Sequence, residues 1–203
     1  RDLVRSRGLG AVYKRQVENN PENEELGNRE VVFGREIYIE RNDFMEEPVK
    51  KFFRLAPGKE VRLKGAYFIT CTDVIKDENG NITEIHCTYD PETKSGSGCT
   101  RKVKGTLHWV EASTAVDIES RLYDYLLKED SDGKDFLGDF NHDSLQVFHS
   151  KGEACLANTV PGDHFQFLRQ GYFVTDKDST SDHIVMNRIV AVSYTHLTLP
   201  TTP

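Results

Sequence analysis

A cluster of basic side chains is the feature of this sequence that points most directly to chemistry. Residues 50–64, KKFFRLAPGKEVRLK, hold six lysines and arginines against the single acid Glu60. An arginine fork donates two parallel hydrogen bonds, which suits a guanine edge, and neighbouring aromatic rings can stack on unpaired bases. The segment therefore predicts a local site for RNA. The alternative is a solvated charged hairpin with Phe52 or Phe53 in the core.

Three side chains of this basic segment are the first candidates for contact with a polyanion. Arg54, Arg62 and Lys64 surround a turn at residues 56–59, APGK. Side chains two apart in a strand share a face, so Arg62 and Lys64 are expected to project together.

Two further clusters are weaker. Residues 101–104, RKVK, are typical of a solvated strand start, and Gln166 and Arg169 lie three residues apart around Phe167. Neither cluster alone indicates a binding site.

The overall charge argues at first against a nucleic-acid partner, because 33 acids outnumber 26 lysines and arginines and the formal net charge is −7. Salt screens charges over about 8–10 Å, however, so the local field decides. An acidic protein with one concentrated basic stretch can still bind a polyanion there.

Catalytic motifs are absent from the sequence. It has no GxSxG elbow, GxGxxG loop, GxxxxGK[ST] loop, HExxH helix or CxxC pair. Its seven histidines are dispersed. Cys71 and Cys87 flank a predicted hairpin and are interpreted as buried free thiols rather than a disulfide or metal pair. We therefore expect no catalytic residues and no bound metal.

Composition favours a soluble protein of a reducing cytoplasm. Apolar residues make up 37% of the chain, and no apolar run approaches the roughly 20 residues that span a bilayer. The start lacks the pattern of a signal peptide. Four scattered cysteines are too few for a disulfide framework. We expect neither a membrane partner nor secretion.

Alternating apolar and polar residues predict strands along most of the chain. An Asn-Gly pair at 79–80 predicts a hairpin with φ > 0 at both positions. Many short strands with frequent turns favour closed barrels, so we expect an all-β fold with two β-barrels, at 17–113 and 130–192. The expected strands are 31–40, 61–71, 82–89, 103–110, 144–149, 164–169, 172–175 and 183–192.

One segment breaks this pattern. In residues 116–128, VDIESRLYDYLLK, Ile118, Leu122, Tyr125 and Leu126 follow helical spacing. An acid near the start and a lysine near the end suit a helix dipole. We predict a connector helix over 114–129.

The two ends differ from the body. Residues 1–16 carry five basic residues and one acid without a clear period, and residues 193–203 are uncharged and rich in threonine. Both resemble translated sequencing adaptor, so we interpret them as non-native tails that pack poorly.

Taken together, these segments resemble the C-terminal half of the glutaminyl-tRNA synthetases. The resemblance is collinear over about residues 17–190. It rests on NNPENEELGNREVVFGREIYIERNDF, KKFFRLAPGKEVRLKGAYFI, DENGNITEIHCTYDPET, RKVKGTLHWV, RLYDYLL, FQFLRQGYFVTD and MNR at 186–188. Related glutamyl-tRNA synthetases share the architecture, but GKEVRLK and RKVKGTLHWV favour the glutamine family.

The resemblance implies two β-barrels that bind the anticodon loop of glutamine tRNA. It assigns Arg54 to the third anticodon base, a guanine, and Arg62 and Lys64 to the first position. It assigns Gln166 and Arg169 to the central uracil. Lys51 joins this set on a weaker match, because Lys51 and Phe53 stand where some members have other residues.

The resemblance also implies an incomplete enzyme. The family's HIGH and KMSKS-type motifs are missing, so we expect a fragment of an ATP-dependent ligase without its catalytic half. It should need no cofactor itself, whereas the whole enzyme uses ATP and Mg²⁺. We expect a cytoplasmic monomer whose partner is glutamine tRNA and not DNA. The alternatives are the equivalent region of a glutamyl-tRNA synthetase, a β-barrel interaction module without an RNA role, and a hydrolase.

Overall fold

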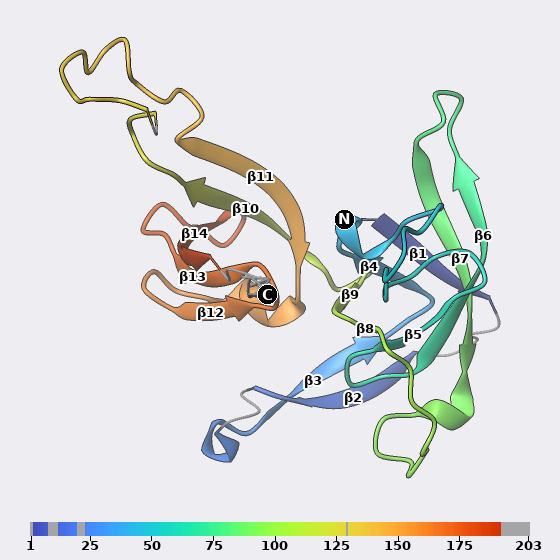
Figure 1. The fold of residues 1–203 in the computed structure, drawn as a ribbon. Helices are drawn as coiled ribbons and strands as arrows, with labels where there is room; N and C mark the ends of the chain where they lie inside the picture. Colours follow the sequence, from blue (N-terminus) through green and yellow to red (C-terminus); the bar gives the residue numbers. More distant parts are fainter. Residues whose placement is uncertain (1, 8–11, 20–22, 129, 192–203) are drawn as a thin grey trace, which may run out of the picture. The chain divides into compact units, whose positions relative to one another are not determined.

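The computed structural model describes all residues except 1, 8–11, 20–22, 129 and 192–203 (Figure 1). The described residues form strands and short 3-10 helices and contain no α-helix, which confirms the all-β class. Contacts divide the chain into unit 1, residues 1–116 and 151–154, and unit 2, residues 117–150 and 155–203. No helix in the described ranges is long and apolar enough to cross a membrane.

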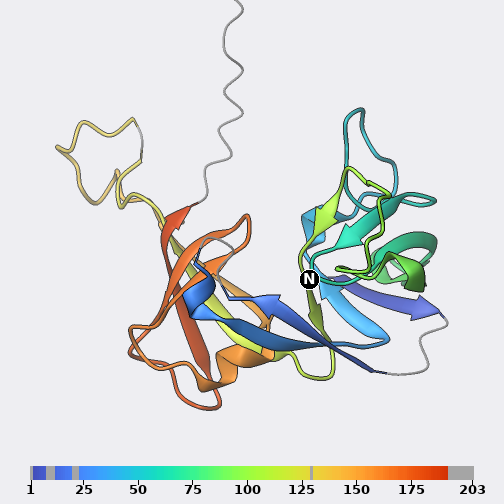
Figure 2. The same ribbon diagram turned by 90° about the horizontal axis from the view of Figure 1, so that it is seen from below.

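Unit 1 is built on a seven-stranded, barrel-like sheet in the order β8-β5-β6-β7-β1-β4-β9 (Figure 1). Its strands are β1 (Asp2–Arg7), β4 (Glu36–Ile39), β5 (Glu60–Leu63), β6 (Phe68–Lys76), β7 (Ile82–Asp90), β8 (Thr106–Leu107) and β9 (Trp109–Glu111). Two parallel pairs, β1–β7 and β5–β8, interrupt an otherwise antiparallel sheet. A separate antiparallel ribbon joins β2 (Tyr13–Glu18) to β3 (Asn28–Phe33), and Figure 2 shows it from below. The 3-10 helices of this part of the chain are η1 (Glu24–Leu26), η2 (Arg41–Asp43) and η3 (Pro91–Thr93).

An aromatic cluster lies in the core of unit 1. The ring of Phe33 lies 5.2 Å from those of Tyr67 and Trp109, and the Tyr67 ring lies 5.4 Å from that of Tyr89. Phe33 is 1% exposed, and the indole of Trp109 donates to the carbonyl oxygen of Lys64 at 2.9 Å. Apolar burial therefore stabilises unit 1 and places the sequence's only tryptophan there.

The predicted hairpin is confirmed, with a different turn. It joins β6 to β7 through residues 77–81, where the Asp77 N–H donates to Asn81 and the Gly80 N–H donates to Asp77. Gly80 has φ +81°, whereas Asn79 is not among the described residues with positive φ. A turn followed by one left-handed glycine is the three-residue loop type, so only Gly80 needs its freedom.

The expectation that residues 1–16 pack poorly is wrong for Asp2–Arg7, which form β1 between β4 and β7. Val4 is 1% exposed and lies opposite Ile37 and Ile85. The backbone N–H and C=O groups of a central strand bond to neighbouring strands on both sides, whatever the pattern of its side chains. One apolar residue that faces the core is therefore enough to place this segment in the sheet. The predicted tail at 193–203 lies outside the described residues.

Unit 2 contains a five-stranded sheet in the order β11-β10-β14-β13-β12. Its strands are β10 (Val116–Tyr123), β11 (Leu145–Gly152), β12 (His164–Phe167), β13 (Gly171–Thr175) and β14 (Ile184–Ala191), and η4 (Ala154–Asn158) follows β11. Phe173, Val185 and Met186 are buried, and the rings of Phe167 and Phe173 stack at 4.4 Å. This sheet carries the second half of the predicted all-β fold.

The predicted connector helix over 114–129 is wrong, because residues 116–123 form β10. Ile118 and Ser120 are buried two residues apart, and Ile118 pairs with Ile184 in the parallel β10–β14 ladder. Tyr125, which belongs to the apolar residues at helical spacing, is 79% exposed and so is not packed against an apolar surface. A helix of this length gains most of its stability from tertiary packing. In this protein the segment packs as a strand of the sheet, and that packing decides its structure.

Candidate nucleic-acid interface

The basic segment, residues 50–64, leads into β5 on the surface of unit 1. Leu55 is fully buried, and its backbone bonds to both Asp43 and Met45. The predicted turn is present, since the Lys59 N–H donates to Ala56 at 2.8 Å and Gly58 has φ +70°. Buried Leu55 and this turn fix the backbone from which the basic side chains project.

The side chains of this segment line an open groove of about 480 Å³. Four basic residues border it, Lys51, Arg54, Lys59 and Lys104, together with the acid Glu60. Its other lining residues are Pro48, Val49, Phe52, Phe53, Val103 and Gly105. The groove thus joins the basic segment to residues 103–105, part of the weaker cluster at 101–104.

The guanidinium of Arg54 is held by two residues of η2, Asn42 and Asp43. Its Nη1 donates to the carbonyl oxygen of Asn42 at 2.7 Å and lies 3.5 Å from a carboxylate oxygen of Asp43. The Asp43 side chain is 1% exposed, whereas that of Arg54 is 38% exposed. A buried acid therefore orients a guanidinium that still reaches solvent.

Arg62 and Lys64 share a face, as predicted. Val61 and Leu63, which alternate with them along the chain, are buried on the opposite face. The Arg62 guanidinium lies 4.6 Å from the centre of the Phe68 ring, a cation–π distance. Both side chains are half-buried, so they combine a fixed stem with an accessible charge.

Arg101 forms an ion pair with the acid of the groove, Glu60. Its Nη2 lies 2.8 Å from carboxylate oxygens of both Glu60 and Asp90, and its guanidinium lies 5.1 Å from the Phe68 ring. The pairing offsets part of the negative charge that Glu60 brings to the groove. The sequence pattern at 101–104 predicts only a solvated strand start, so it gives no signal of this role of Arg101.

Phe52 and Phe53 are not in the core. Phe52 is half-buried and Phe53 is 50% exposed, while the ammonium of Lys104 lies 4.9 Å from the Phe53 ring centre. The description of this segment as a hairpin with a phenylalanine in the core is therefore wrong. An aromatic ring beside several cations remains at the surface.

Gln166 and Arg169 lie in unit 2, at the connection between β12 and β13. Gln166 is exposed on β12 opposite Tyr172, and Arg169 is half-buried in the turn closed by the Gln170 N–H donating to Phe167 at 2.8 Å. The structure therefore places Gln166 on β12 and Arg169 in the turn that follows it, both within unit 2.

Two candidate residues share an unusual backbone. Lys51 has φ +67° and Arg169 has φ +65°, and they are the two non-glycine residues with positive φ in the described ranges. This conformation costs a side-chain-bearing residue about 1–2 kcal/mol, and such strain concentrates at functional sites. Sequence alone gives no signal of it.

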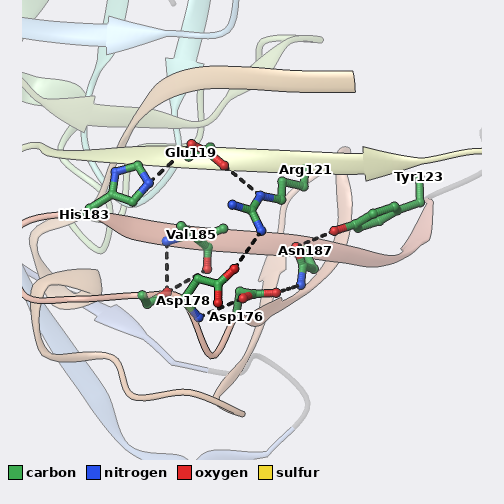
Figure 3. A network of polar contacts seen from close by, with 9 residues as sticks. Glu119, Arg121, Tyr123, Asp176, Asp178, His183, Val185 and Asn187 are labelled. Carbon is green, nitrogen blue, oxygen red and sulfur yellow. Dashed lines mark hydrogen bonds and ion pairs between the residues drawn. The ribbon is translucent and has the colours of Figure 1, made fainter. Parts of the chain in front are cut away.

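A polar network in unit 2 ties β10 to the connection between β13 and β14 (Figure 3). Arg121 lies between Glu119, at 2.7 Å, and Asp178, at 3.4 Å. The hydrogen bond from Arg121 to Glu119 lowers the pKa of Glu119 and raises the pKa of Arg121. Further members are Tyr123, Asp176, His183 and Asn187. Three carboxylates surround Arg121 and His183 here, so the network is not a basic surface for RNA and serves to position the strands.

Cys71 and Cys87 lie directly opposite each other in the β6–β7 pair. Both are buried and free, which agrees with their interpretation as buried thiols. A hydrogen bond between them lowers the pKa of Cys71 and raises the pKa of Cys87. No group of three or more potential metal ligands occurs in the part of the chain that the structure describes.

Comparisons with known proteins match both units. Residues 5–90 and residues 106–176 match two family models, each described as "tRNA synthetases class I (E and Q), anti-codon binding domain". The chain is 55% identical over 182 residues to the glutamine--tRNA ligase of Clostridium perfringens, covering 87% of this chain and 33% of that protein.

Two further relatives carry the same name. The glutamine--tRNA ligase of Clostridioides difficile is 55% identical over 181 residues, 86% of this chain and 33% of that protein. That of Rhodopirellula baltica is 49% identical over 187 residues, 89% of this chain and 31% of that protein. The chain thus spans about a third of the length of the curated relatives it matches.

Proposed function

Because the chain belongs to the anticodon-binding family of the class I tRNA synthetases for E and Q, we propose that it is the anticodon-recognition part of a glutamine–tRNA ligase. Its partner is then the anticodon loop of glutamine tRNA. The observation that carries this proposal is the groove of unit 1, where Arg54 and three lysines surround an exposed aromatic ring. Proteins bind unpaired RNA with cations along its phosphate backbone and with aromatic rings that stack on its bases.

Arg54 reads the guanine at the third anticodon position in this proposal. Its described contacts with Asn42 and Asp43 are made through Nη1. A guanidinium carries five N–H donors in a planar fork, so an edge of Arg54 can still donate two parallel bonds to a guanine. The buried carboxylate of Asp43 holds that fork in place before the base arrives.

The other candidates take the remaining positions. Arg62 and Lys64 bind around the first anticodon base, and Lys51 contributes from the rim of the groove. Gln166 and Arg169 bind the central uracil from unit 2, since an amide and a guanidinium together offer donors and an acceptor to its edge.

The rest of the ligase supplies catalysis. The relatives are about three times longer than the matched region, so the attachment of glutamine with ATP and Mg²⁺ belongs to parts outside this chain. We place the protein in the cytoplasm as a monomer. The equivalent region of a glutamyl-tRNA synthetase is not favoured, because the relatives described above are glutamine--tRNA ligases.

The Arg54→Ala variant tests the proposal. It should weaken binding to a glutamine-tRNA anticodon stem-loop by about 1–3 kcal/mol, measured by fluorescence titration. Arg54→Lys should recover only part of the loss, because an ammonium cannot match the fork. On a loop whose third anticodon base is not guanine the loss should shrink, since the same contact cannot be removed twice.

Lys59→Ala is the matched control for charge alone. Lys59 is exposed at the turn, so its loss should weaken all stem-loops equally and flatten the salt dependence. Equal losses for Arg54→Ala on guanine and non-guanine loops would reduce Arg54 to a general electrostatic contact.

The left-handed backbone of Lys51 gives a second test. Lys51→Gly should be more stable than Lys51→Ala by about 1 kcal/mol, because only glycine adopts this φ without strain. Both variants should lose the same binding, since both lack the ammonium. Urea unfolding followed by Trp109 fluorescence and stem-loop titration measure the two effects. Equal stabilities, or unchanged binding in both variants, would contradict the assignment.

A further inference from the structure

Of the two aromatic residues that line the groove, Phe53 is the more exposed. Half of it is exposed, and the neighbouring Val49 is 65% exposed. Exposing a large apolar ring to water is unfavourable, and cations at Lys51, Lys59 and Lys104 surround it in the same groove. The site thus combines an apolar platform with charges that attract a phosphate chain.

The main chain of Phe53 is closely packed, and its ring contacts a cation. The Lys104 ammonium lies 4.9 Å from the ring centre, and a cation there holds the ring electrostatically. At Gly105 an added Cβ would come within 2.1 Å of the Phe53 carbonyl oxygen. The chain at 103–105 therefore passes directly against Phe53, which is possible because residue 105 has no side chain.

Charge in the groove also favours an anion near this ring. Glu60 is the acid among the lining residues, and Arg101 pairs with it at 2.8 Å. Arg101, which Glu60 shares with Asp90, offsets part of the charge of this acid, and basic side chains remain in excess in the groove. A phosphate beside the ring would meet attraction from several sides.

We propose that Phe53 is a stacking platform for one unpaired nucleobase of the bound RNA, and that Lys104 contacts the phosphate next to that base. This inference rests on the proposed function and adds a residue pair to it. Stacking tolerates any base because every base has a π-face. Phe53 then contributes affinity and positions the loop, while sequence is read by the hydrogen-bonding residues.

The test titrates the chain with the anticodon stem-loop and with a series of loops in which each unpaired position in turn is abasic. Phe53→Ala should weaken binding to the intact loop roughly 5- to 150-fold. Phe53→Tyr should bind like the unchanged chain, and Phe53→Leu should not, because leucine keeps apolar contact without a π-face. One abasic position should weaken the unchanged chain but have no further effect on Phe53→Ala.

Salt dependence separates the two members of the pair. Lys104→Gln should reduce the slope of log K against log salt by about 0.7 in magnitude, the value for one phosphate contact to a single strand. Phe53→Ala should leave the slope unchanged. Thermal unfolding followed by Trp109 fluorescence should be the same in all variants, since both side chains are exposed.

The outcomes distinguish this inference from the function beneath it. If the unchanged chain binds the stem-loop, but Phe53→Ala binds within twofold of it or loses affinity equally at every abasic position, the stack is wrong and the proposed function stands. If the unchanged chain binds no stem-loop, the proposed function is wrong and the stack falls with it.

Discussion

Replacing Gly105 by alanine is expected to lower the free energy of unfolding of unit 1 by about 3 kcal/mol. The new Cβ would lie 2.1 Å from the Phe53 carbonyl oxygen and 3.1 Å from Cγ1 of Val61. A main-chain oxygen cannot rotate away as a flexible side chain can. The Gly105 carbonyl accepts the Arg62 N–H at 2.9 Å, so relieving the clash also disturbs the β5–β8 pairing.

Urea unfolding followed by Trp109 fluorescence measures this change, because the tryptophan is buried in unit 1. Gly96→Ala is the control. Its Cβ would meet nothing within 4 Å, but its φ of +85° is unfavourable for alanine, so it should cost only about 1 kcal/mol. Adding Phe53→Ala should not rescue Gly105→Ala, since the colliding atom belongs to the backbone. Equal losses at residues 96 and 105 would contradict the close approach.

Strands were predictable where apolar and polar residues alternate. The type of element was ambiguous where the same spacing of apolar residues fits both a strand and a helix. Residues four apart lie on one face of a helix and also on one face of a strand, so Ile118 and Leu122 fit both. The spacing of Tyr125 and Leu126 then favoured a helix wrongly. Pairing of β10 with β14 decided the structure, and that partner is more than 60 residues away.

The candidate site was predictable in its charge but not in its contacts. The basic segment was evident from composition, whereas Gln166 and Arg169 emerged only from resemblance to a family. The pairing of Arg101 with Glu60 and of Lys104 with Phe53 depends on β5 and β8 lying side by side. Gly105, placed within a strand pattern, was the available signal of a close backbone approach.

The largest electrostatic effect is expected at Glu153, which lies in unit 1 with Arg29 and His108. Arg29 binds its two carboxylate oxygens at 2.7 and 3.0 Å, and the His108 ring lies 2.9 Å away. Burial alone would raise the pKa of Glu153, but hydrogen bonds with His108 and Arg29 outweigh it and lower the pKa to about 2. The folded state thus favours the charged carboxylate.

The pKa shift determines how stability depends on pH. A carboxyl whose pKa is depressed by folding stabilises the protein above its unfolded value, 4.5, and this stabilisation disappears as the pH falls toward 2. A shift of this size corresponds to about 3 kcal/mol at neutral pH. Glu153→Gln should therefore lower the free energy of unfolding of unit 1 by about 3 kcal/mol at pH 7.

Urea unfolding at a series of pH values, again followed by Trp109 fluorescence, measures the difference between Glu153→Gln and the unchanged chain. The difference should be constant above pH 5 and shrink steadily toward pH 2, because protonation removes the same charge that the substitution removes. Glu78→Gln, at an exposed position of the β6–β7 hairpin, should change stability by less than about 0.5 kcal/mol. A Glu153→Gln difference that stays the same from pH 7 to pH 2.5 would mean that lost packing, and not the ion pair with Arg29, accounts for the effect.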